Sequence, residues 1–344
     1  MFTADIPTYW IDLGRDEAKR WEEVISREKL AARRLIEEAG IQFERIPGLL
    51  RWIFARLYQG FGGLYRGEIA SWAEALGVSV GTATVLNCAY ELSHLRWPKP
   101  LGCTAGVRWV DGVGMLHVRS LDWPLVTMGA ATCLFRLRRG TREFVSVGVP
   151  GYVGVLSGML PQAYSVTINW APAAAFPTFD FGPAFLLRDT LETCDSYESA
   201  VDRLTETRLS TSVFFTVCGA ERDQACVIER TQRDAAIRKM AGPVLVQANH
   251  HVAERFGRNN EDILEGGDEA DLFSLMGSSK RANTLSRALA EMPVTCTPDM
   301  AANTLNSQTV LNQDTCQQMV FCPGSGEVKV WRRVEGTGVE SRER

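Results

Sequence analysis

Three residues of this chain have the types and spacing needed for nucleophilic chemistry. Cys103 is followed by Arg119 and then by Asp122, across two β-rich runs at residues 103–110 and 115–121. If these runs pair as a hairpin, the end of the second strand returns beside the start of the first. A guanidinium group there would favour the thiolate of Cys103, and a carboxylate could hold a nearby amine. The spacing therefore predicts a reactive cysteine at the start of a strand.

Two local signals support this arrangement. Asp111 and Gly112 form a dipeptide typical of hairpin turns between the two runs. The segment 96–102 carries two prolines, which cannot continue a helix, so an exposed linker is expected just before Cys103. The alternative is a buried cysteine that opens a strand, beside charges that are merely solvated. The other cysteines of the chain are interpreted as small buried hydrophobic residues.

A second route to cysteine chemistry is a Cys–His pair of the papain type. His117 lies two residues before Arg119 on the same predicted strand, and alternate residues of a strand share one face. We expect a buried or edge histidine at this position, with a catalytic His117 as the alternative.

No motif for a cofactor, metal or nucleic acid is present. The nine cysteines include no CxxC pair and no cysteine–histidine cluster with zinc spacing, and neither a phosphate loop nor a Rossmann fingerprint occurs. We therefore expect no cofactor and no metal. The net charge of -4 gives no electrostatic reason to expect nucleic acid as a partner.

The sequence also carries no sign of export. Its N-terminus has neither a basic region nor an apolar one, and no run of 18 apolar residues occurs. An odd number of cysteines points to free thiols in a reducing compartment, so we expect a cytoplasmic protein of bacterial type. Residues 49–61 form an apolar stripe at helical spacing, flanked by arginines. We expect this helix to pack on the body, and peripheral membrane contact through 49–61 is the alternative.

The predicted elements divide the chain near residue 102. Residues 15–60 and 66–92 favour helices, the latter broken at Gly77 and restarted near Ser79. Beyond residue 102 the pattern indicates an α+β body of antiparallel strands with helices packed on them. Further strands are predicted at 132–138, 143–149, 164–169, 212–218, 225–230 and 244–248, helices at 181–207 and 280–291, and two closing strands within 308–333.

Several segments together resemble the N-terminal-nucleophile amidases of the acid ceramidase and N-acylethanolamine acid amidase family, which belongs to the choloylglycine hydrolase-like superfamily. Bile salt hydrolases and penicillin acyltransferases are more distant relatives. The segments carrying the resemblance are 61–69, Leu86-Asn87-Cys88-Ala89-Tyr90-Glu91, Gly102-Cys103-Thr104, 114–122 with its Arg-x-x-Asp spacing, 150–159, 165–169, 246–249 and Arg281.

The resemblance implies a four-layer αββα fold and an inactive precursor that cuts itself before Cys103. Residues 1–102 would be a helical propeptide that stays bound as a small subunit, and residues 103–344 would form the catalytic domain. It further implies that Arg119 tunes the sulfur and Asp122 orients the freed α-amine. Asn249 and Asn169 would stabilise the oxyanion, and Arg281 would complete the polar network.

This sequence departs from the relatives beside the predicted site. Trp170 stands where they often carry a carboxylate, which alters the polarity beside the scissile bond. The other departures are Ala105, Ser120, His250 and Lys280. Apolar and aromatic residues are plentiful nearby and suit an acyl chain, since each buried methylene contributes about 0.8 kcal/mol. The residues proposed to line this acyl site are Trp123, Tyr152, Val153, Met159 and Trp170. The alternative is that each of them belongs to the sheet core.

Three functions are compatible with these residues. The first is hydrolysis of a lipid-like N-acyl amide with an apolar acyl chain, such as an N-acylethanolamine, a ceramide or an N-acyl amino acid. The second is acyl transfer from the same thioester to an amine. The third is a non-catalytic lipid-binding homologue, against which the joint presence of Cys103, Arg119, Asp122 and Asn249 argues.

Overall fold

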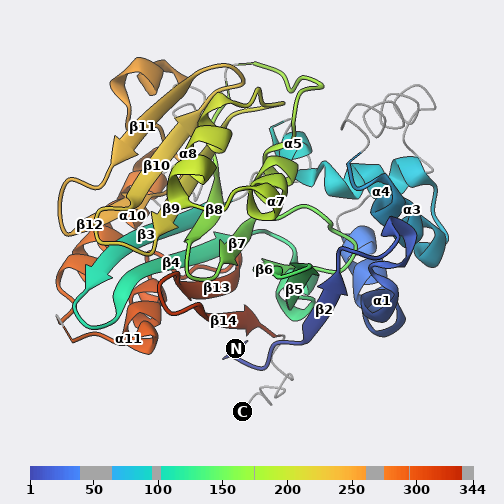
Figure 1. Ribbon diagram of the computed structural model, residues 1–344. Helices are drawn as coiled ribbons and strands as arrows, with labels where there is room; N and C mark the ends of the chain where they lie inside the picture. The colour runs from blue at the N-terminus through green and yellow to red at the C-terminus, as the bar shows by residue number, and fades with distance from the viewer. Residues whose placement is uncertain (39–63, 95–101, 174, 261–274, 294, 335–344) are drawn as a thin grey trace, which may run out of the picture.

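A computed structural model describes residues 1–38, 64–94, 102–173, 175–260, 275–293 and 295–334. Two β-sheets lie face to face, and helices cover the outer face of each (Figure 1). Helices α10 and α11 pack on one sheet, and α7 and α8 pack on the other. The expected four-layer αββα architecture is therefore confirmed.

Sheet A has six strands and sheet B has eight. The order in sheet A is β1 (Phe2–Thr3), β14 (Glu327–Arg333), β13 (Thr315–Cys322), β4 (Gly114–Asp122), β3 (Gly102–Val110) and β12 (Val244–Gln247). The order in sheet B is β11 (Ala235–Lys239), β10 (Ala225–Arg230), β9 (Val213–Gly219), β8 (Tyr164–Trp170), β7 (Ser157–Leu160), β6 (Arg142–Gly148), β5 (Cys133–Arg139) and β2 (Thr8–Asp12).

The helices fall into an N-terminal group and a group that covers the sheets. The first group contains α1 (Glu22–Glu38), α3 (Arg66–Leu76), α4 (Val80–Asn87) and α5 (Ala89–Ser93). The second contains α7 (Pro183–Thr193), α8 (Tyr197–Glu206), α10 (Leu275–Ala290) and α11 (Pro298–Asn303), while the short α6 (Val126–Ala130) follows β4. Short 3₁₀ helices occur at Glu17–Lys19, Glu254–Asn260 and Thr304–Asn306.

The predicted hairpin is present as β3 and β4. Its register pairs Gly102 with Asp122 and Ala105 with Arg119, so both charges arrive at the start of β3. Alternate residues of β3 face opposite sides, as the pleat requires. Gly106 faces α10, where an added methyl group would come within 2.6 Å of Leu289. The opposite face packs between the two sheets.

The N-terminal segment is not purely helical. Strand β1 pairs with β14 at one edge of sheet A, and β2 runs parallel to β5 at one edge of sheet B. Both strands are too short for their sequence pattern to predict them. The predicted break at Gly77 is confirmed, because this residue ends α3 in a left-handed conformation and Ser79 caps α4. The predicted helix over 49–61 lies outside the described residues.

The helical stretch predicted at 181–207 is two helices instead of one. Helix α7 ends at Thr193, and the side chains of Ser196 and Ser199 form a capping box that starts α8. Strands β7 and β11 and helix α11 were not predicted, since each spans only four to six residues. The remaining strand predictions agree with the structure to within one or two residues at most ends.

A buried ion cluster joins the N-terminal segment to the body. Glu68 of α3 accepts two hydrogen bonds from Arg188 of α7, at 2.6 and 2.7 Å, and neither side chain is exposed. Arg20 and the indole nitrogen of Trp21 donate to the same carboxylate. Burial by itself would raise the pKa of Glu68, but the ion pair with Arg188 and these hydrogen bonds hold it below its ordinary value.

No single helix in the described part of the chain is long and apolar enough to cross a membrane. Helices α3 and α4 would pass this test only when taken together, and they are bent by 115° relative to each other.

Candidate active site

Cys103 is the second residue of β3 and is almost fully buried. Its backbone nitrogen donates a hydrogen bond of 2.9 Å to the side-chain oxygen of Asn249. Its sulfur accepts a hydrogen bond of 3.3 Å from Nη2 of Arg119. The nitrogen and the sulfur of one residue are thus held by two different polar side chains.

Arg119 is fixed by sheet B, which it faces across the interior. It donates to the backbone carbonyl groups of Leu156 and Ile168 and to the hydroxyl of Ser157. These bonds point the guanidinium at the sulfur. Burial raises the pKa of the Cys103 thiol, and the charge and hydrogen bond of Arg119 lower it again. Arg119 therefore offsets part of the desolvation of a buried thiolate.

Asp122 lies opposite Gly102, at the peptide bond that precedes Cys103. Its Oδ1 accepts hydrogen bonds from Ser120 at 3.1 Å and Thr315 at 2.7 Å. Its Oδ2 is buried and has no hydrogen-bond partner among the described residues. A methyl group added to Gly102 would lie 3.3 Å from this oxygen, so glycine keeps the space beside it open. One carboxylate oxygen is thus anchored and the other is unpaired.

Asn249 and Arg281 come from distant parts of the chain. Asn249 follows β12, and its backbone nitrogen donates to Ser278 of α10 at 2.8 Å. Arg281, one turn further along α10, donates to the Asn249 side-chain oxygen at 2.7 Å and to the Thr104 hydroxyl at 3.2 Å. The predicted polar network is present, and α10 holds it against the start of β3.

Asn169 occupies a different role from the one the resemblance implies. Its amide nitrogen donates to the carbonyl groups of Gln247 and Ala248, at 2.9 and 3.1 Å. Its side-chain oxygen is buried without a hydrogen-bond partner among the described residues. Asn169 therefore presents an acceptor, which suits an ammonium group and not an oxyanion. In Asn249 the amide nitrogen donates to the Trp170 carbonyl at 2.9 Å.

Three residues near the site carry no signal that sequence reasoning could use. Thr315 and Ser157 orient Asp122 and Arg119, yet a hydroxyl residue on a strand is common. Tyr90 of α5 is fully buried and donates to the carbonyl groups of Asn169, at 3.3 Å, and Ser212, at 3.0 Å. It belongs to a segment that carries the resemblance, but its spacing suggests no particular role.

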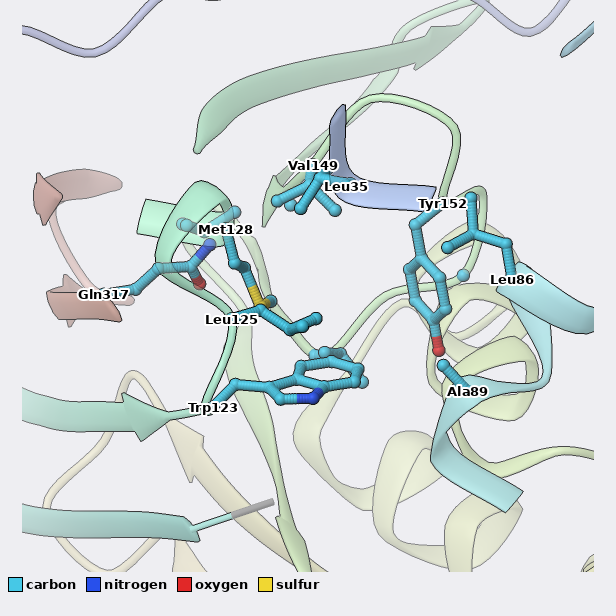
Figure 2. Close-up of a pocket in the computed structure, with 13 residues that line it drawn as sticks. Leu35, Leu86, Ala89, Trp123, Leu125, Met128, Val149, Tyr152 and Gln317 are labelled. Atoms are coloured by element: carbon cyan, nitrogen blue, oxygen red, sulfur yellow. The ribbon is translucent and has the colours of Figure 1, made fainter. Parts of the chain in front are cut away.

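An apolar pocket adjoins the site (Figure 2). Its cavity volume is about 40 Å³, and further space beside it is open to solvent. Its lining residues are Leu35, Leu86, Ala89, Trp123, Leu125, Met128, Val147, Gly148, Val149, Tyr152, Gly154, Leu156 and Gln317. The pocket reaches the site through Trp123, which follows Asp122, and through Leu156, whose carbonyl binds Arg119. Both the N-terminal segment and the body build it.

Only some of the residues proposed to line the acyl site do so in the structure. Trp123 and Tyr152 line the pocket. Met159 is fully buried in the core between the sheets, with Met319 and Phe321, because its neighbour Gly158 faces α7. Trp170 is half-buried, and its ring centre lies 5.2 Å from that of His94. Val153, Met159 and Trp170 are not among the lining residues.

His117 does not approach Cys103 in a catalytic arrangement. Its ring nitrogens contact the hydroxyl groups of Ser165 and Thr167 on β8, at 2.9 and 3.0 Å. Burial, with a smaller contribution from Arg119, lowers its pKa to about 3. Among the residues that the structure describes, no group of three or more His, Cys, Asp or Glu side chains could hold a metal ion. All nine cysteines are free and buried.

The layered fold, with a cysteine at the start of a central strand and its backbone nitrogen inside a polar network, is that of the N-terminal-nucleophile hydrolases. A solved structure, the Caenorhabditis elegans N-acylethanolamine-hydrolyzing acid amidase ortholog, has this fold and superposes with a TM-score of 0.55. It is 21% identical, and the match covers 67% of this chain and 100% of that one.

The family model described as "Acyl-coenzyme A:6-aminopenicillanic acid acyl-transferase" matches residues 116–309, more than half of the chain, so the chain belongs to this family. It is 25% identical over 242 residues to the N-acylethanolamine-hydrolyzing acid amidase of Caenorhabditis elegans, covering 66% of this chain and 68% of the relative. It is 24% identical over 275 residues to acid ceramidase of Rattus norvegicus, covering 68% and 66%. The chain thus spans about two thirds of the length of these relatives. The expected family, a class of enzymes acting on amide bonds, is confirmed.

Proposed function

We propose that this protein hydrolyses N-acyl amides with apolar acyl chains, using Cys103 as the nucleophile after the chain has cut itself before this residue. The proposed substrates are N-acylethanolamines, ceramides or N-acyl amino acids. The observation that carries the proposal is a pair of hydrogen bonds to Cys103. Its backbone nitrogen donates to Asn249, and its sulfur accepts from Arg119. A structural cysteine has no need of a guanidinium group at its sulfur, whereas any buried backbone nitrogen needs an acceptor.

The first step of the proposal is self-cleavage. The Cys103 thiolate attacks the carbonyl carbon of Gly102, the peptide C–N bond breaks, and the Cys103 nitrogen takes a proton to become an amine. Water then hydrolyses the resulting thioester, which releases the Gly102 carboxylate and regenerates the thiol. The unpaired Oδ2 of Asp122 supports this step, because it lies where a newly charged ammonium would need a partner.

Turnover would repeat the same chemistry on a substrate. The freed α-amine, with an ordinary pKa of about 7.7–8.0, takes the thiol proton and passes it to the leaving amine. The acyl group stays on the sulfur until water cleaves the thioester. Asn249 and Asp122 offer acceptor oxygens to the two N–H hydrogens of the α-amine, which would leave its lone pair free to face the sulfur.

The acyl pocket supports retention of the cleaved segment. Leu35, Leu86 and Ala89 come from the N-terminal segment and form part of the pocket wall. We infer that residues 1–102 remain bound to residues 103–344, since loss of the segment would open the pocket to water. The buried ion pair between Glu68 and Arg188 joins the two fragments.

Intact mass spectrometry tests the processing step. Purified protein should convert from a 344-residue chain into fragments 1–102 and 103–344, with cysteine at the new N-terminus. The variant C103A should stay intact, whereas C316A, which removes a buried thiol of β13, serves as the matched control and should process normally. Fully active protein that remains a single chain would contradict the mechanism.

A homologous series of N-acyl amides tests the acyl pocket. We expect kcat/KM to rise with acyl length until the pocket is full, because each buried methylene contributes about 0.8 kcal/mol. The amine head group should matter less, since Trp170 offers no charge to bind it. Equal rates from acetyl to palmitoyl amides would refute an apolar acyl site.

The family description favours one alternative, acyl transfer to an amine in place of water. Both reactions share the thioester, and they differ only in the second nucleophile. Product analysis with and without an added amine separates them. Acyl transfer predicts a new amide that replaces most of the free acid, while hydrolysis predicts free acid at either amine concentration.

A further inference from the structure

Two buried hydrogen-bond donors lie in the mostly apolar lining of the pocket, which also includes the amide of Gln317. The indole nitrogen of Trp123 and the hydroxyl of Tyr152 have no hydrogen-bond partner among the described residues. Both side chains are only 6% exposed. Buried polar groups are nearly always paired, and one that is left alone carries a desolvation penalty. Two such groups lining one pocket indicate a ligand that supplies the missing acceptor.

The two donors lie on one side of the pocket. Figure 2 shows the Tyr152 hydroxyl beside Ala89 and the Trp123 nitrogen on the ring edge turned away from Leu125 and Met128, and both lie away from Leu35 and Val149. This side belongs to the reactive end, because Trp123 directly follows Asp122, the residue that lies opposite Gly102. Apart from Gln317, whose amide nitrogen donates to Thr132, the remaining side chains of the lining are apolar and include Leu35 and Val149 on the far wall. A bound acyl chain would therefore meet the donors near its amide end and apolar atoms beyond.

The chemistry of the donors defines the missing group. Both present N–H or O–H hydrogens, so they require an acceptor. None of the residues that line the pocket is charged, which disfavours a carboxylate or phosphate there. Burial, reinforced by the charge of nearby Glu91, raises the pKa of Tyr152 well above its ordinary value and keeps the phenol protonated as a donor. A neutral oxygen with two lone pairs fits these requirements.

We propose that the pocket selects acyl chains bearing a keto or hydroxyl oxygen within the first few carbons beyond the scissile carbonyl. The oxygen accepts a hydrogen bond from Tyr152 or from Trp123, and the rest of the chain packs against the apolar part of the lining. This inference rests on the proposed amide hydrolysis and specifies its substrate class further.

Paired substrates test the inference on processed protein. The dodecanoyl, 3-oxododecanoyl, 3-hydroxydodecanoyl and 11-oxododecanoyl amides of one amine have nearly equal length and differ in the oxygen. We expect kcat/KM for the 3-oxo amide to exceed that for the plain amide by about tenfold, the gain typical of one or two hydrogen bonds to buried donors. The 11-oxo amide should show no gain, because its oxygen would meet the apolar part of the lining.

Two variants identify the donors, and a third serves as the control. Tyr152→Phe removes one oxygen atom that has no partner, so folding should be preserved, and the ratio of 3-oxo to plain rates should fall several-fold. Trp123→Phe should lower the same ratio. Met128→Leu changes an aliphatic part of the lining and should alter both rates equally, leaving the ratio unchanged.

The outcomes separate this inference from the function on which it rests. Hydrolysis of the plain amide at a rate equal to or above that of the 3-oxo and 3-hydroxy amides overturns the inference and leaves amide hydrolysis standing. A preference that survives both Tyr152→Phe and Trp123→Phe also overturns it. Failure to hydrolyse any of the four amides overturns both proposals together.

Discussion

Replacing Arg188 by methionine would test how the N-terminal segment is held on the body. In the folded chain its guanidinium binds Glu68 through two nitrogens, donates to Glu192 at 2.8 Å and to the Val153 carbonyl at 2.8 Å, and lies over the Tyr65 ring. Methionine preserves much of the apolar volume but removes the charge. The substitution therefore leaves a buried carboxylate without its main partner.

The expected loss of stability follows from this geometry. Removing one partner of a fully buried ion pair costs about 3–5 kcal/mol. Arg20 and Trp21 still donate to Glu68, so we expect a value near the lower end, about 3 kcal/mol. The control is Arg203→Met, which breaks a pair with Asp189 whose arginine is 41% exposed. That change should cost less than about 1 kcal/mol.

Urea unfolding in the uncut C103A background measures both variants without interference from cleavage. The midpoint of Arg188→Met should fall well below that of Arg203→Met at an unchanged slope. The stabilisation should also depend on pH. Because the pKa of Glu68 is lowered on folding, its contribution is present above the ordinary value of 4.5 and is lost as pH falls through the folded-state value. If the two variants lose equal stability at neutral pH, the buried cluster does not hold the N-terminal segment on the body.

The remaining predictions concern individual groups near the site. Arg119→Ala should move the pH–rate profile to higher pH and lower kcat/KM, because the thiol of Cys103 would lose the charge that offsets its burial; an unmoved profile would argue against this role. His117→Ala should retain both processing and hydrolysis, since its ring contacts only hydroxyl groups of β8 and an aromatic neighbour, and inactivity in a folded variant would revive the Cys–His alternative. Burial raises the pKa of Glu91 to about 7, so folding stability should fall by about 3 kcal/mol as pH rises from about 4.5 to about 7. Glu91→Gln should flatten that slope in urea unfolding measured across the range, and an unchanged slope would contradict the assignment.

The local part of the site could be predicted from the sequence alone. Cys103, Arg119 and Asp122 lie on one hairpin, whose turn dipeptide and strand period place both charges at the sulfur. The long-range part could not be predicted in this way. Asn249 and Arg281 reach Cys103 only because β12 and α10 pack on β3, and nothing in the spacing of these residues encodes that packing.

Roles were harder to predict than positions. The resemblance placed Asn169 near the nucleophile. Which end of its amide faces the site depends on the carbonyl groups of Gln247, the last residue of β12, and Ala248, because both accept from the amide nitrogen. The direction of Met159 was likewise undecided, because a one-residue shift on a strand reverses the face that a side chain occupies. The buried partner of Glu68 had no local signal, since Arg188 lies in a separate helix.

The two short strands at the N-terminus have a consequence for any attempt to produce the catalytic part alone. Strands β1 and β2 cap one edge of each sheet, next to β14 and β5. A chain beginning at Cys103 would lack β1 and β2, so the backbone groups of β14 and β5 would face solvent unpaired. This arrangement drives edge-to-edge association. Such a fragment should self-associate on refolding, and supplying residues 1–102 in trans should restore a monodisperse complex. In this view the N-terminal segment acts as an intramolecular chaperone for both sheets.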